Sequence, residues 1–459
     1  MKPSTGSKHR ALTAALLALL LGGALGWFRV GPPPEVTIEP ELPGIGRSTA
    51  VTIRAAEPQR GLSRLAVELV QGERVQGLAE RRHEPRPFWA FWGPRVASDE
   101  LSVEVGSETV SGLVEGEATL RVTAERAATW VRRPAPVVVE LTLPVRLTPP
   151  KVEVTSSQNY VAQGGSAAVV YAVGPSSVRD GVRVAGYWFP GHPLPGGAAG
   201  ERFALFAAPH DLEDASEIHL TAVDDVGNER AISFVDRFLA RPLRTDTIEL
   251  SDRFMERVVP AILAHSPQVE DRGDLLATYL AVNRDLRRFN AEALLELAAK
   301  STPRFLWRQP FLQLPNTQSM ASFADRRTYL YQGREVDRQD HLGFDLASVR
   351  HAPVLAANRG TVLLAEYFGI YGNTVVLDHG YGLMTLYAHL SSFEVAVGQE
   401  VALGDSLGRT GQTGLAGGDH LHFSVLLNGL QVNPLEWWDP QWIENRIARK
   451  LGKGFALAS

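Results

Sequence analysis

A short, glycine-rich stretch near the C-terminal end of the chain concentrates side chains that can perform chemistry. Half of the twelve histidines in the sequence fall there. The stretch opens with His341 and Asp345, spaced H-x-x-x-D, and closes with His420 and His422, spaced H-x-H, with His389 between the two pairs. Imidazole and carboxylate groups are common ligands of zinc in enzymes. This combination of residue types therefore indicates a zinc hydrolase site.

A catalytic zinc ion takes three protein ligands and keeps a fourth position for water. His341, Asp345 and His422 can supply two imidazoles and one carboxylate, and such a site lowers the pKa of bound water to about 7. His420 and His422 are two residues apart, so both can face one cleft if they lie on a strand. The sequence has no cysteine, which excludes thiolate ligands and disulfide bonds. It also has no H-E-x-x-H motif, so a glutamate base of that kind is not available.

The segments around these residues have the pattern of short strands. Glycine-containing turn signals alternate with apolar runs such as 361–365 and 374–377. Such alternation is typical of hairpins in an antiparallel sheet. We therefore expect an antiparallel β domain over residues 325–440, followed by a C-terminal tail at 441–459.

The order of the motifs in this domain resembles that of the lysostaphin-type (LytM-like) zinc metalloendopeptidases of bacterial cell walls. The resemblance runs from about residue 325 to residue 437. The loop before H-x-H departs from the family, because it reads Ala416-Gly-Gly-Asp419 where Ser-Thr-Gly-Pro is usual. The resemblance rests on five segments in the family's order: Pro353–Ala357, Gly372–Gly380, Thr385–Ser391, Val397–Gly404 and Gly411–Phe423.

The resemblance also implies a role for each site residue. It places one Zn²⁺ per chain on His341, Asp345 and His422. It gives His389 and His420 the roles of general base and transition-state stabiliser, which imidazoles near a metal can perform. The implied activity is hydrolysis of the peptide cross-links of peptidoglycan, whose stem peptides would be the binding partners.

Other residues near the site have weaker patterns. Tyr387 stands two residues before His389, so it can share the face of that histidine and is a candidate to orient substrate. His351 and His379 fit no ligand position, and we expect them in turns or on the surface. Asp419, beside His420, either holds that imidazole or is solvated.

Upstream of the candidate site, the sequence predicts a multidomain and mainly β chain. Residues 31–148 and 149–240 carry short alternating strands separated by Gly, Pro and Asp clusters. That spacing is typical of β-sandwiches, and we expect two immunoglobulin-like modules.

Residues 241–324 form a helical region and connector in this interpretation. Apolar residues recur at helical spacing over 251–263 and 271–300, and Ser251 or Asp252 can cap the first helix. The stretch that begins near residue 304 shows no clear period.

The N-terminal residues 1–30 have the pattern of a membrane anchor. Lys8 and Arg10 precede an apolar run at 11–28, which is long enough to span a bilayer. The basic residues predict a single-pass helix in the cytoplasmic membrane, with the catalytic domain outside the cytoplasm on its periplasmic or extracellular face. A cleaved signal peptide is the alternative. The net charge of −5 and the absence of a basic stripe argue against nucleic acid as a partner.

Three hypotheses about function follow from the sequence. The first is a zinc-dependent endopeptidase that cuts peptidoglycan cross-links. The second is a non-catalytic, wall-binding regulator that activates other wall hydrolases, although the chain retains all five site residues. The third is a structural or adhesive protein that only binds the wall. A further hypothesis is that the helical region covers the groove and restrains the enzyme.

Overall fold

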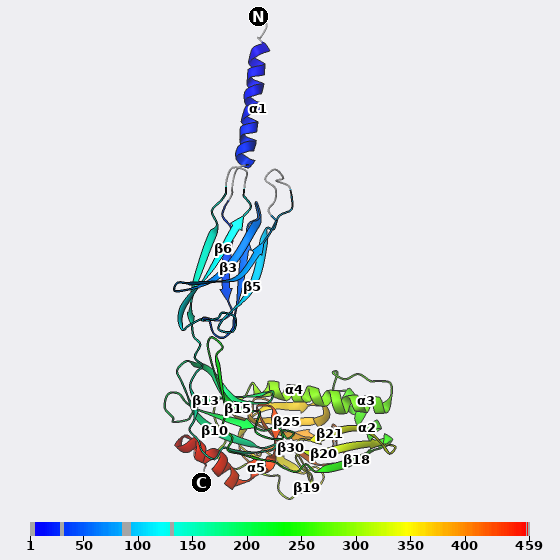
Figure 1. The fold of residues 1–459 in the computed structure, drawn as a ribbon. Helices are drawn as coiled ribbons and strands as arrows, with labels where there is room; N and C mark the ends of the chain where they lie inside the picture. Colours follow the sequence, from blue (N-terminus) through cyan, green and yellow to red (C-terminus); the bar gives the residue numbers. More distant parts are fainter. Residues whose placement is uncertain (1–4, 28–31, 85–92, 129–132, 456, 458–459) are drawn as a thin grey trace. The chain divides into compact units, whose positions relative to one another are not determined.

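The computed structural model describes residues 5–27, 32–84, 93–128, 133–455 and 457 (Figure 1). The chain divides into two compact units. Residues 1–150 and 223–229 form the first unit, and residues 151–222 and 230–459 form the second. Strands far outnumber helices among the described elements, as the sequence predicts.

Helix α1, Thr5–Trp27, covers most of the expected membrane anchor. Among the residues that the structure describes, no helix is long and apolar enough to cross a membrane. The structure therefore does not support the predicted anchor at residues 1–30, of which 1–4 and 28–30 lie outside the described part. The first turns of α1 contain the polar residues Lys8, His9 and Arg10. The remaining apolar part of the helix is therefore shorter than the roughly 20 residues that a membrane crossing takes.

The rest of the first unit is a β-sandwich. Its buried residues come from both sheets, so one core lies between them; Ile53 and Leu120 are examples with no exposed surface. Strand β6 alternates buried and partly exposed residues, which is the pattern of a sheet with one covered face. The strand orders are β1-β2-β5 and β4-β3-β6-β7, with β1 Glu35–Pro40, β2 Thr49–Ala56, β3 Leu62–Gln71, β4 Arg74–Arg82, β5 Ser98–Val105, β6 Gly116–Arg126 and β7 Val137–Val145. The immunoglobulin-like character of this module stays a prediction.

The second unit begins with another strand-rich module. Two four-stranded sheets have the orders β13-β14-β10-β8 and β12-β11-β15-β16, and β17 pairs with β9 in parallel. The strands are β8 Val152–Val154, β9 Tyr160–Ala162, β10 Ser166–Val173, β11 Ser177–Val184, β12 Tyr187–Pro190, β13 His192–Pro193, β14 Glu201–Ala207, β15 Ile218–Asp224, β16 Glu229–Ser233 and β17 Arg237–Leu239.

The helical region follows the expected order with one irregularity. Helix α2, Asp252–Leu263, is capped by Ser251, whose side chain accepts from the Phe254 amide, as predicted. Asp274 caps α3, Leu275–Ala281; a π-helical turn at Val282–Leu286 then joins α3 to α4, Arg287–Ala298. Strand β18, Thr245–Leu250, precedes these helices.

Three strands before residue 342 have no recognisable pattern in the sequence; β19 lies in the connector expected within 241–324, and β20 and β21 lie at the start of the β domain expected over 325–440. β19 covers Gln318–Ala321, β20 covers Asp325–Tyr331 and β21 covers Arg334–His341. β18 pairs in parallel with β20, which forms a hairpin with β21. This sheet positions His341 at the site, because His341 is the last residue of β21. The strands carry mostly polar residues, so hydrophobic periodicity gives no signal for them.

The C-terminal β domain is an eight-stranded sheet, ordered β19-β22-β30-β26-β25-β24-β28, with β31 paired to β30. A small sheet, β23-β29-β27, accompanies it. The strands are β22 Phe344–Ala347, β23 Pro353–Leu355, β24 Gly360–Tyr367, β25 Asn373–Gly380, β26 Leu383–Ala388, β27 Ser392–Phe393, β28 Glu400–Val401, β29 Ser406–Arg409, β30 Leu421–Leu427 and β31 Leu430–Val432. A short 3₁₀ turn, Gly369–Tyr371, links β24 to β25.

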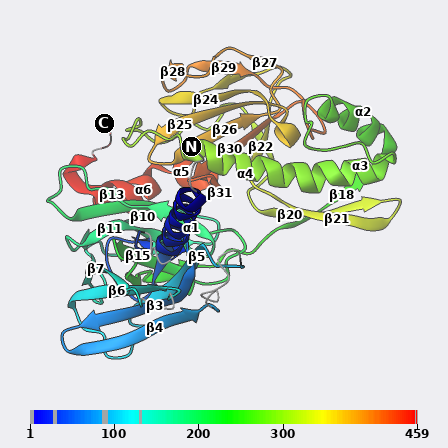
Figure 2. The same cartoon turned by 90° about the horizontal axis from the view of Figure 1, so that it is seen from above.

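The central strands of this sheet are covered on both faces, because every residue of β26 and β30 is buried. One face, with Phe423 and Val425, shares a core with the preceding β module and the C-terminal helices. The other face, with Leu386 and Leu426, shares a core with α2–α4. Figure 2 shows α2–α4 at one side of the domain. Since alternate residues point to opposite faces, His422 lies on the side of the helices.

The C-terminal segment packs against the β module of the second unit. It comprises α5 Pro434–Trp438, α6 Pro440–Ile443, a π-helical turn Glu444–Ala448, α7 Arg449–Leu451 and a 3₁₀ turn Gly452–Gly454. Lys450 Nζ donates to Asn159 Oδ1 at 3.0 Å and to the Ala168 carbonyl at 2.8 Å. The Glu436 carboxyl accepts from the Ser166 amide at 2.7 Å. Buried and partly buried polar contacts therefore join the module to the C-terminal segment.

Glu436 should make the stability of the second unit depend on pH. Burial raises the pKa of its carboxyl to about 7, from an ordinary 4.5. A raised folded-state pKa gives stability that is complete below about pH 4.5 and is lost as the pH rises through about 7. We expect this loss to reach roughly 3 kcal/mol. In Glu436→Gln, the free energy of unfolding, measured by denaturant titration with tryptophan fluorescence, should lack this decline.

Glu153→Gln is the matched control, because Glu153 is exposed on β8. It should keep the pH dependence of the wild type. If Glu436→Gln also kept the full decline, the titrating group would lie elsewhere.

Candidate metal centre

Three residues that the sequence singles out come together from strands β21, β22 and β30. His341 ends β21, Asp345 lies on β22 and His422 lies on β30, where Asp345 and His422 are direct cross-strand neighbours. Asp345 Oδ1 is 2.9 Å from both His341 Nε2 and His422 Nδ1, and these two nitrogens are 3.0 Å apart. One ligand atom from each residue lies within 4.8 Å of the other two. The three side chains thus form a group that could hold a metal ion.

Outer hydrogen bonds fix the tautomers of the two histidines in this group. His341 Nδ1 lies 3.0 Å from the Ser322 carbonyl, which can only accept, so the ring proton is on Nδ1. Ser424 Oγ donates to the Leu342 carbonyl at 2.8 Å, so it accepts from His422 Nε2 at 3.0 Å. His341 Nε2 and His422 Nδ1 therefore keep their lone pairs toward Asp345. Such outer contacts orient metal ligands in proteins.

The other two histidines of the motif set lie beside the group. His389 Nδ1 donates to the Thr413 carbonyl at 2.8 Å, and His420 Nδ1 donates to the Gly418 carbonyl at 2.8 Å. Each ring therefore keeps its Nε2 unprotonated when it is neutral. The two ring centroids are 4.9 Å apart, and His420 Nε2 is 3.5 Å from Asp345 Oδ1.

His389 has a left-handed backbone, with a φ of 62°. A histidine in this conformation is uncommon, and the surrounding structure must hold it there. The His389 amide donates to the Tyr371 carbonyl at 2.9 Å, and the ring is fixed by Thr413. Because β26 ends at Ala388, this turn carries the imidazole out of the strand and into the pocket.

Burial and neighbouring charges divide the four ionisable groups into distinct states. Burial lowers the pKa of His422 to about 4. Burial, together with the charges of the nearby His420 and His422, holds the pKa of His389 well below its usual value. Burial opposes protonation of His420 as well, but the hydrogen bond and charge of Asp345 raise its pKa. Burial would raise the pKa of Asp345, yet His341, through its charge and hydrogen bond, holds that pKa well below the ordinary range.

The donor set fits a catalytic metal. Two imidazole nitrogens and one ionised carboxylate converge, and neutral imidazole with carboxylate is the chemistry that zinc accepts in hydrolases. His341 and His422 are 6% and 5% exposed, so the group is enclosed. It borders a pocket of about 120 Å³, which His389 and His420 also line.

Two residues of this pocket carry no signal in the sequence. Arg327, on β20, has Nη2 3.1 Å from Asp345 Oδ2, and Arg287, the first residue of α4, lines the same pocket. Both precede the H-x-x-x-D motif and lie in segments without a recognisable catalytic pattern. Only the packing of the helices and of the β20–β21 hairpin against the sheet reveals them.

Two predictions about neighbouring residues are wrong. Tyr387 does not face the pocket: its ring belongs to the core on the opposite face of the sheet, and its hydroxyl accepts from the Ala357 amide at 2.8 Å. His379 is fully buried and does not lie in a turn or on the surface. Its Nδ1 donates to the Arg359 carbonyl, and its Nε2 contacts Thr385 Oγ1. His351, in contrast, is exposed in a turn, as predicted.

Asp419 holds the loop rather than the neighbouring histidine. Thr410 Oγ1 donates to Asp419 Oδ1 at 2.6 Å, and the His351 amide lies 3.4 Å from the same oxygen. From the helical region, Arg257 Nη2 donates to the Ala416 carbonyl at 2.8 Å. The loop in which the chain departs from the family is therefore tied to α2. Restraint of the site by these helices stays a prediction.

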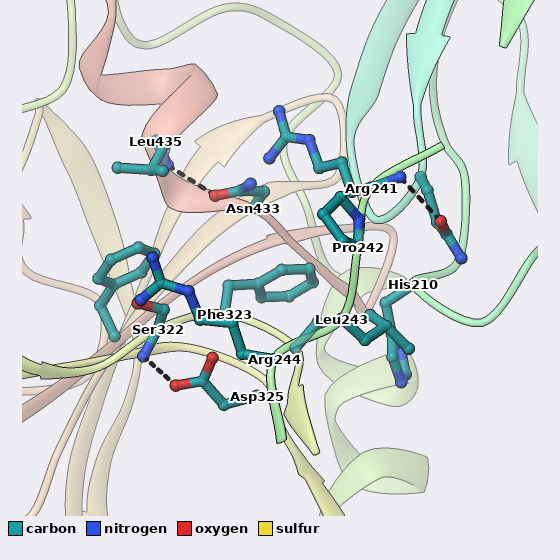
Figure 3. Close-up of a pocket in the computed structure, with 13 residues that line it drawn as sticks. His210, Arg241, Pro242, Leu243, Arg244, Ser322, Phe323, Asp325, Asn433 and Leu435 are labelled. Carbon is teal, nitrogen blue, oxygen red and sulfur yellow. Dashed lines mark hydrogen bonds between the residues drawn. The ribbon is translucent and has the colours of Figure 1, made fainter. Parts of the chain in front are cut away.

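A second pocket, of about 220 Å³, shares a wall with the metal group (Figure 3). The wall is the loop 322–325, in which the Ser322 amide donates to Asp325 Oδ2 at 2.8 Å. The Ser322 carbonyl of the same loop accepts from His341. Figure 3 also shows Arg241, Phe323 and Leu435 around this pocket.

Comparisons with known proteins agree with the motifs. Peptidase family M23 matches residues 339–434. The DD-carboxypeptidase/endopeptidase Mpg of Neisseria meningitidis is 42% identical over 95 residues, and the peptidoglycan DD-endopeptidase ShyA of Vibrio cholerae is 38% identical over 96 residues. Each match covers 21% of this chain and 22% of the relative. The catalytic domain of lysostaphin from Staphylococcus simulans is 26% identical, covers 27% of this chain and 92% of that domain, and has a TM-score of 0.23.

An antiparallel β domain that gathers two histidines and an aspartate at one pocket defines the class of lysostaphin-type peptidase domains. Residues 339–434 are a peptidase family M23 domain, which confirms the resemblance of the motifs. The chain matches only about 22% of the length of its curated relatives. The activity, substrate and partners of the whole protein are therefore subjects of proposal.

Ser424→Ala should weaken metal binding without unfolding the domain. The substitution removes the oxygen that accepts from His422 Nε2, so the tautomer with a free Nδ1 loses its support. Loss of such an outer contact costs about 10–100-fold in affinity. We expect the Zn²⁺ dissociation constant, measured by competition with a chromophoric chelator, to rise by that factor. The control is Ser176→Ala, exposed in the β module; equal affinity of both variants would contradict the role of Ser424.

Proposed function

We propose that this chain is a zinc-dependent endopeptidase that hydrolyses peptide cross-links of peptidoglycan. The observation that carries the proposal is the convergence of the lone pairs of His341 Nε2 and His422 Nδ1 with the carboxylate of Asp345, beside two further imidazoles. The substrate follows from the relatives, since ShyA is described as a peptidoglycan DD-endopeptidase. Peptidoglycan lies outside the cytoplasmic membrane, so we also propose that the site works outside the cytoplasm.

His341, Asp345 and His422 would hold the zinc ion. When bound, zinc supplies Lewis-acid chemistry that polarises a carbonyl and acidifies water. The chain has to place the peptide and move protons around that centre. The burial of the ligands excludes bulk water, which strengthens every electrostatic contact in the pocket.

His389 and His420 have different roles in this mechanism. The depressed pKa of His389 keeps its Nε2 unprotonated, so it can accept the proton of the attacking water. The pKa of His420 is raised, so its Nε2 can carry a proton and donate it toward the negative charge that develops on the peptide oxygen. The proton taken by His389 can then pass to the leaving amine.

The regulator hypothesis has less support. A wall-binding protein without catalysis has no need for four histidines with fixed tautomers, yet each ring here donates to a defined acceptor. The chain retains the complete set of side chains for hydrolysis.

Substitutions should separate metal binding from catalysis. His341→Ala should lose both zinc and activity, because it removes a ligand. His389→Ala should keep stoichiometric zinc and lose about 10²–10⁴-fold in rate, since only proton transfer is lost. Zinc is measured by elemental analysis, and activity by mass spectrometry of muropeptides released from cross-linked sacculi. His265→Ala, at an exposed histidine on the helical region, is the control.

The wild-type result decides the proposal. If the full chain binds zinc and leaves every cross-link intact, the proposal fails and the regulator hypothesis gains support. Chelation of zinc should abolish hydrolysis, and added Zn²⁺ should restore it.

A further inference from the structure

The pocket beside the metal group has a cationic wall. Of the residues that line it, Asp345 is the single acidic one, whereas Arg287 and Arg327 both contribute guanidinium groups. Asp345 forms an ion pair with Arg327 and contacts His341 and His422, so the charge of one guanidinium, that of Arg287, exceeds the negative charge of the protein there. This excess suits an anionic part of a ligand.

Arg287 is held firmly but is not neutralised. Its Nε donates to the Asn283 carbonyl at 3.2 Å, and its Nη2 donates to Asn283 Oδ1 at 2.9 Å. Asn283 is itself fixed, because its Nδ2 donates to Asp337 Oδ2 at 2.8 Å. Within the described residues, no carboxylate forms an ion pair with Arg287. The contacts therefore orient the guanidinium and leave its charge available.

The backbone places Arg287 at the pocket by a local irregularity. A π-helical turn over Val282–Leu286 immediately precedes it, and Asn283 lies within that turn. Such turns are rare and are often found at functional sites. The turn also lets Arg284 donate to Asp337 Oδ1 at 2.8 Å, so both oxygens of that buried carboxylate are used in positioning the helix.

Arg327 contributes a second guanidinium to the pocket, which is already paired with Asp345. Its Nη2 contacts Asp345 Oδ2, but its Nε is buried and has no hydrogen-bond partner. A buried guanidinium donor without an acceptor is costly, and native proteins usually satisfy such groups. The side chain is only 19% exposed, so it cannot turn into bulk solvent.

We propose that Arg287 and Arg327 form a subsite for a carboxylate that the peptide substrate carries close to its scissile bond. This proposal rests on the endopeptidase function proposed above. The planar guanidinium matches a carboxylate in two hydrogen bonds, and no neutral side chain provides the same geometry. The carboxylate is either the C-terminus of the peptide or a side-chain group, and both sources share this chemistry.

The subsite gives the helical region a role in substrate selection. Arg287 lies outside the residues that match the M23 family, so the helix supplies a specificity group that the peptidase domain alone lacks. A peptide with a neutral amide in place of the carboxylate would leave the charge of Arg287 uncompensated near the metal and would bind less tightly.

The first experiment uses the wild-type full chain with zinc bound. Cross-linked muropeptides are compared in three forms: unmodified, amidated at the C-terminus, and amidated at the side-chain carboxylate. We expect one of the two amidations to lower kcat/KM by about 10–100-fold, the usual range for loss of a charge-assisted hydrogen bond. The position of the sensitive amide identifies the source of the carboxylate. Equal cleavage of all three forms would overturn the subsite and leave the endopeptidase function standing.

The second experiment tests Arg287 directly. Arg287→Met should lower kcat/KM for the unmodified peptide to the level of the amidated one and leave the amidated peptide unchanged, while zinc content stays at the wild-type value. Arg287→Lys should be intermediate, because it keeps the charge and loses the planar fork. Arg288→Met is the matched control, since the neighbouring Arg288 is 61% exposed and contacts Glu292; it should behave as wild type.

Equilibrium binding provides a readout that does not need turnover. In the His389→Ala background, calorimetry should show weaker binding of the unmodified peptide after Arg287→Met, by the same factor. If Arg287→Met binds and cleaves all peptides as wild type does, Arg287 is not part of a subsite. If no wild-type preparation cleaves any peptide, the proposed function itself fails, and an unchanged calorimetric affinity would then refute the subsite separately.

Discussion

The site depends on one constraint: each of its four imidazoles gives a ring proton to a fixed acceptor. Three acceptors are backbone carbonyls, of Ser322, Thr413 and Gly418, and the fourth is the Ser424 hydroxyl. A carbonyl cannot donate, so the nitrogen that faces the pocket keeps its lone pair. Metal binding and proton transfer both need that lone pair. The loops must therefore be held in place before the histidines can act, and the rest of the domain serves that requirement.

The sheet meets this requirement by being buried on both faces. The C-terminal helices and the preceding β module cover one face, and α2–α4 cover the other. The metal group occupies the end of the second face, where β22 and β30 bring Asp345 beside His422. Because the helices fill the rest of that face, residues from them border the pocket. The peptidase domain in this chain is consequently shaped by segments outside its family match.

The sequence predicted part of this arrangement correctly. The antiparallel domain, its M23 character and the Ser251 cap follow from motifs, turn signals and periodicity. Tyr387 was assigned to the wrong face, because the left-handed turn at His389 breaks the alternation on which that assignment rested. The polar strands β20 and β21 gave no periodic signal at all. The predicted membrane anchor rests on an apolar run and its flanking basic residues, and the described helix does not support it.

By itself, the sequence determined the types and order of the reactive groups, because H-x-x-x-D and H-x-H fix local spacing on strands. It could not determine which distant groups complete the pocket. Arg327 meets Asp345 through the β20–β21 hairpin, and Arg287 reaches the pocket through a π-helical turn packed on the sheet. These contacts arise from long-range packing and strand pairing, which depend on tertiary structure. Local spacing therefore encoded the candidate ligands, and only the folded chain decided the charge that surrounds them.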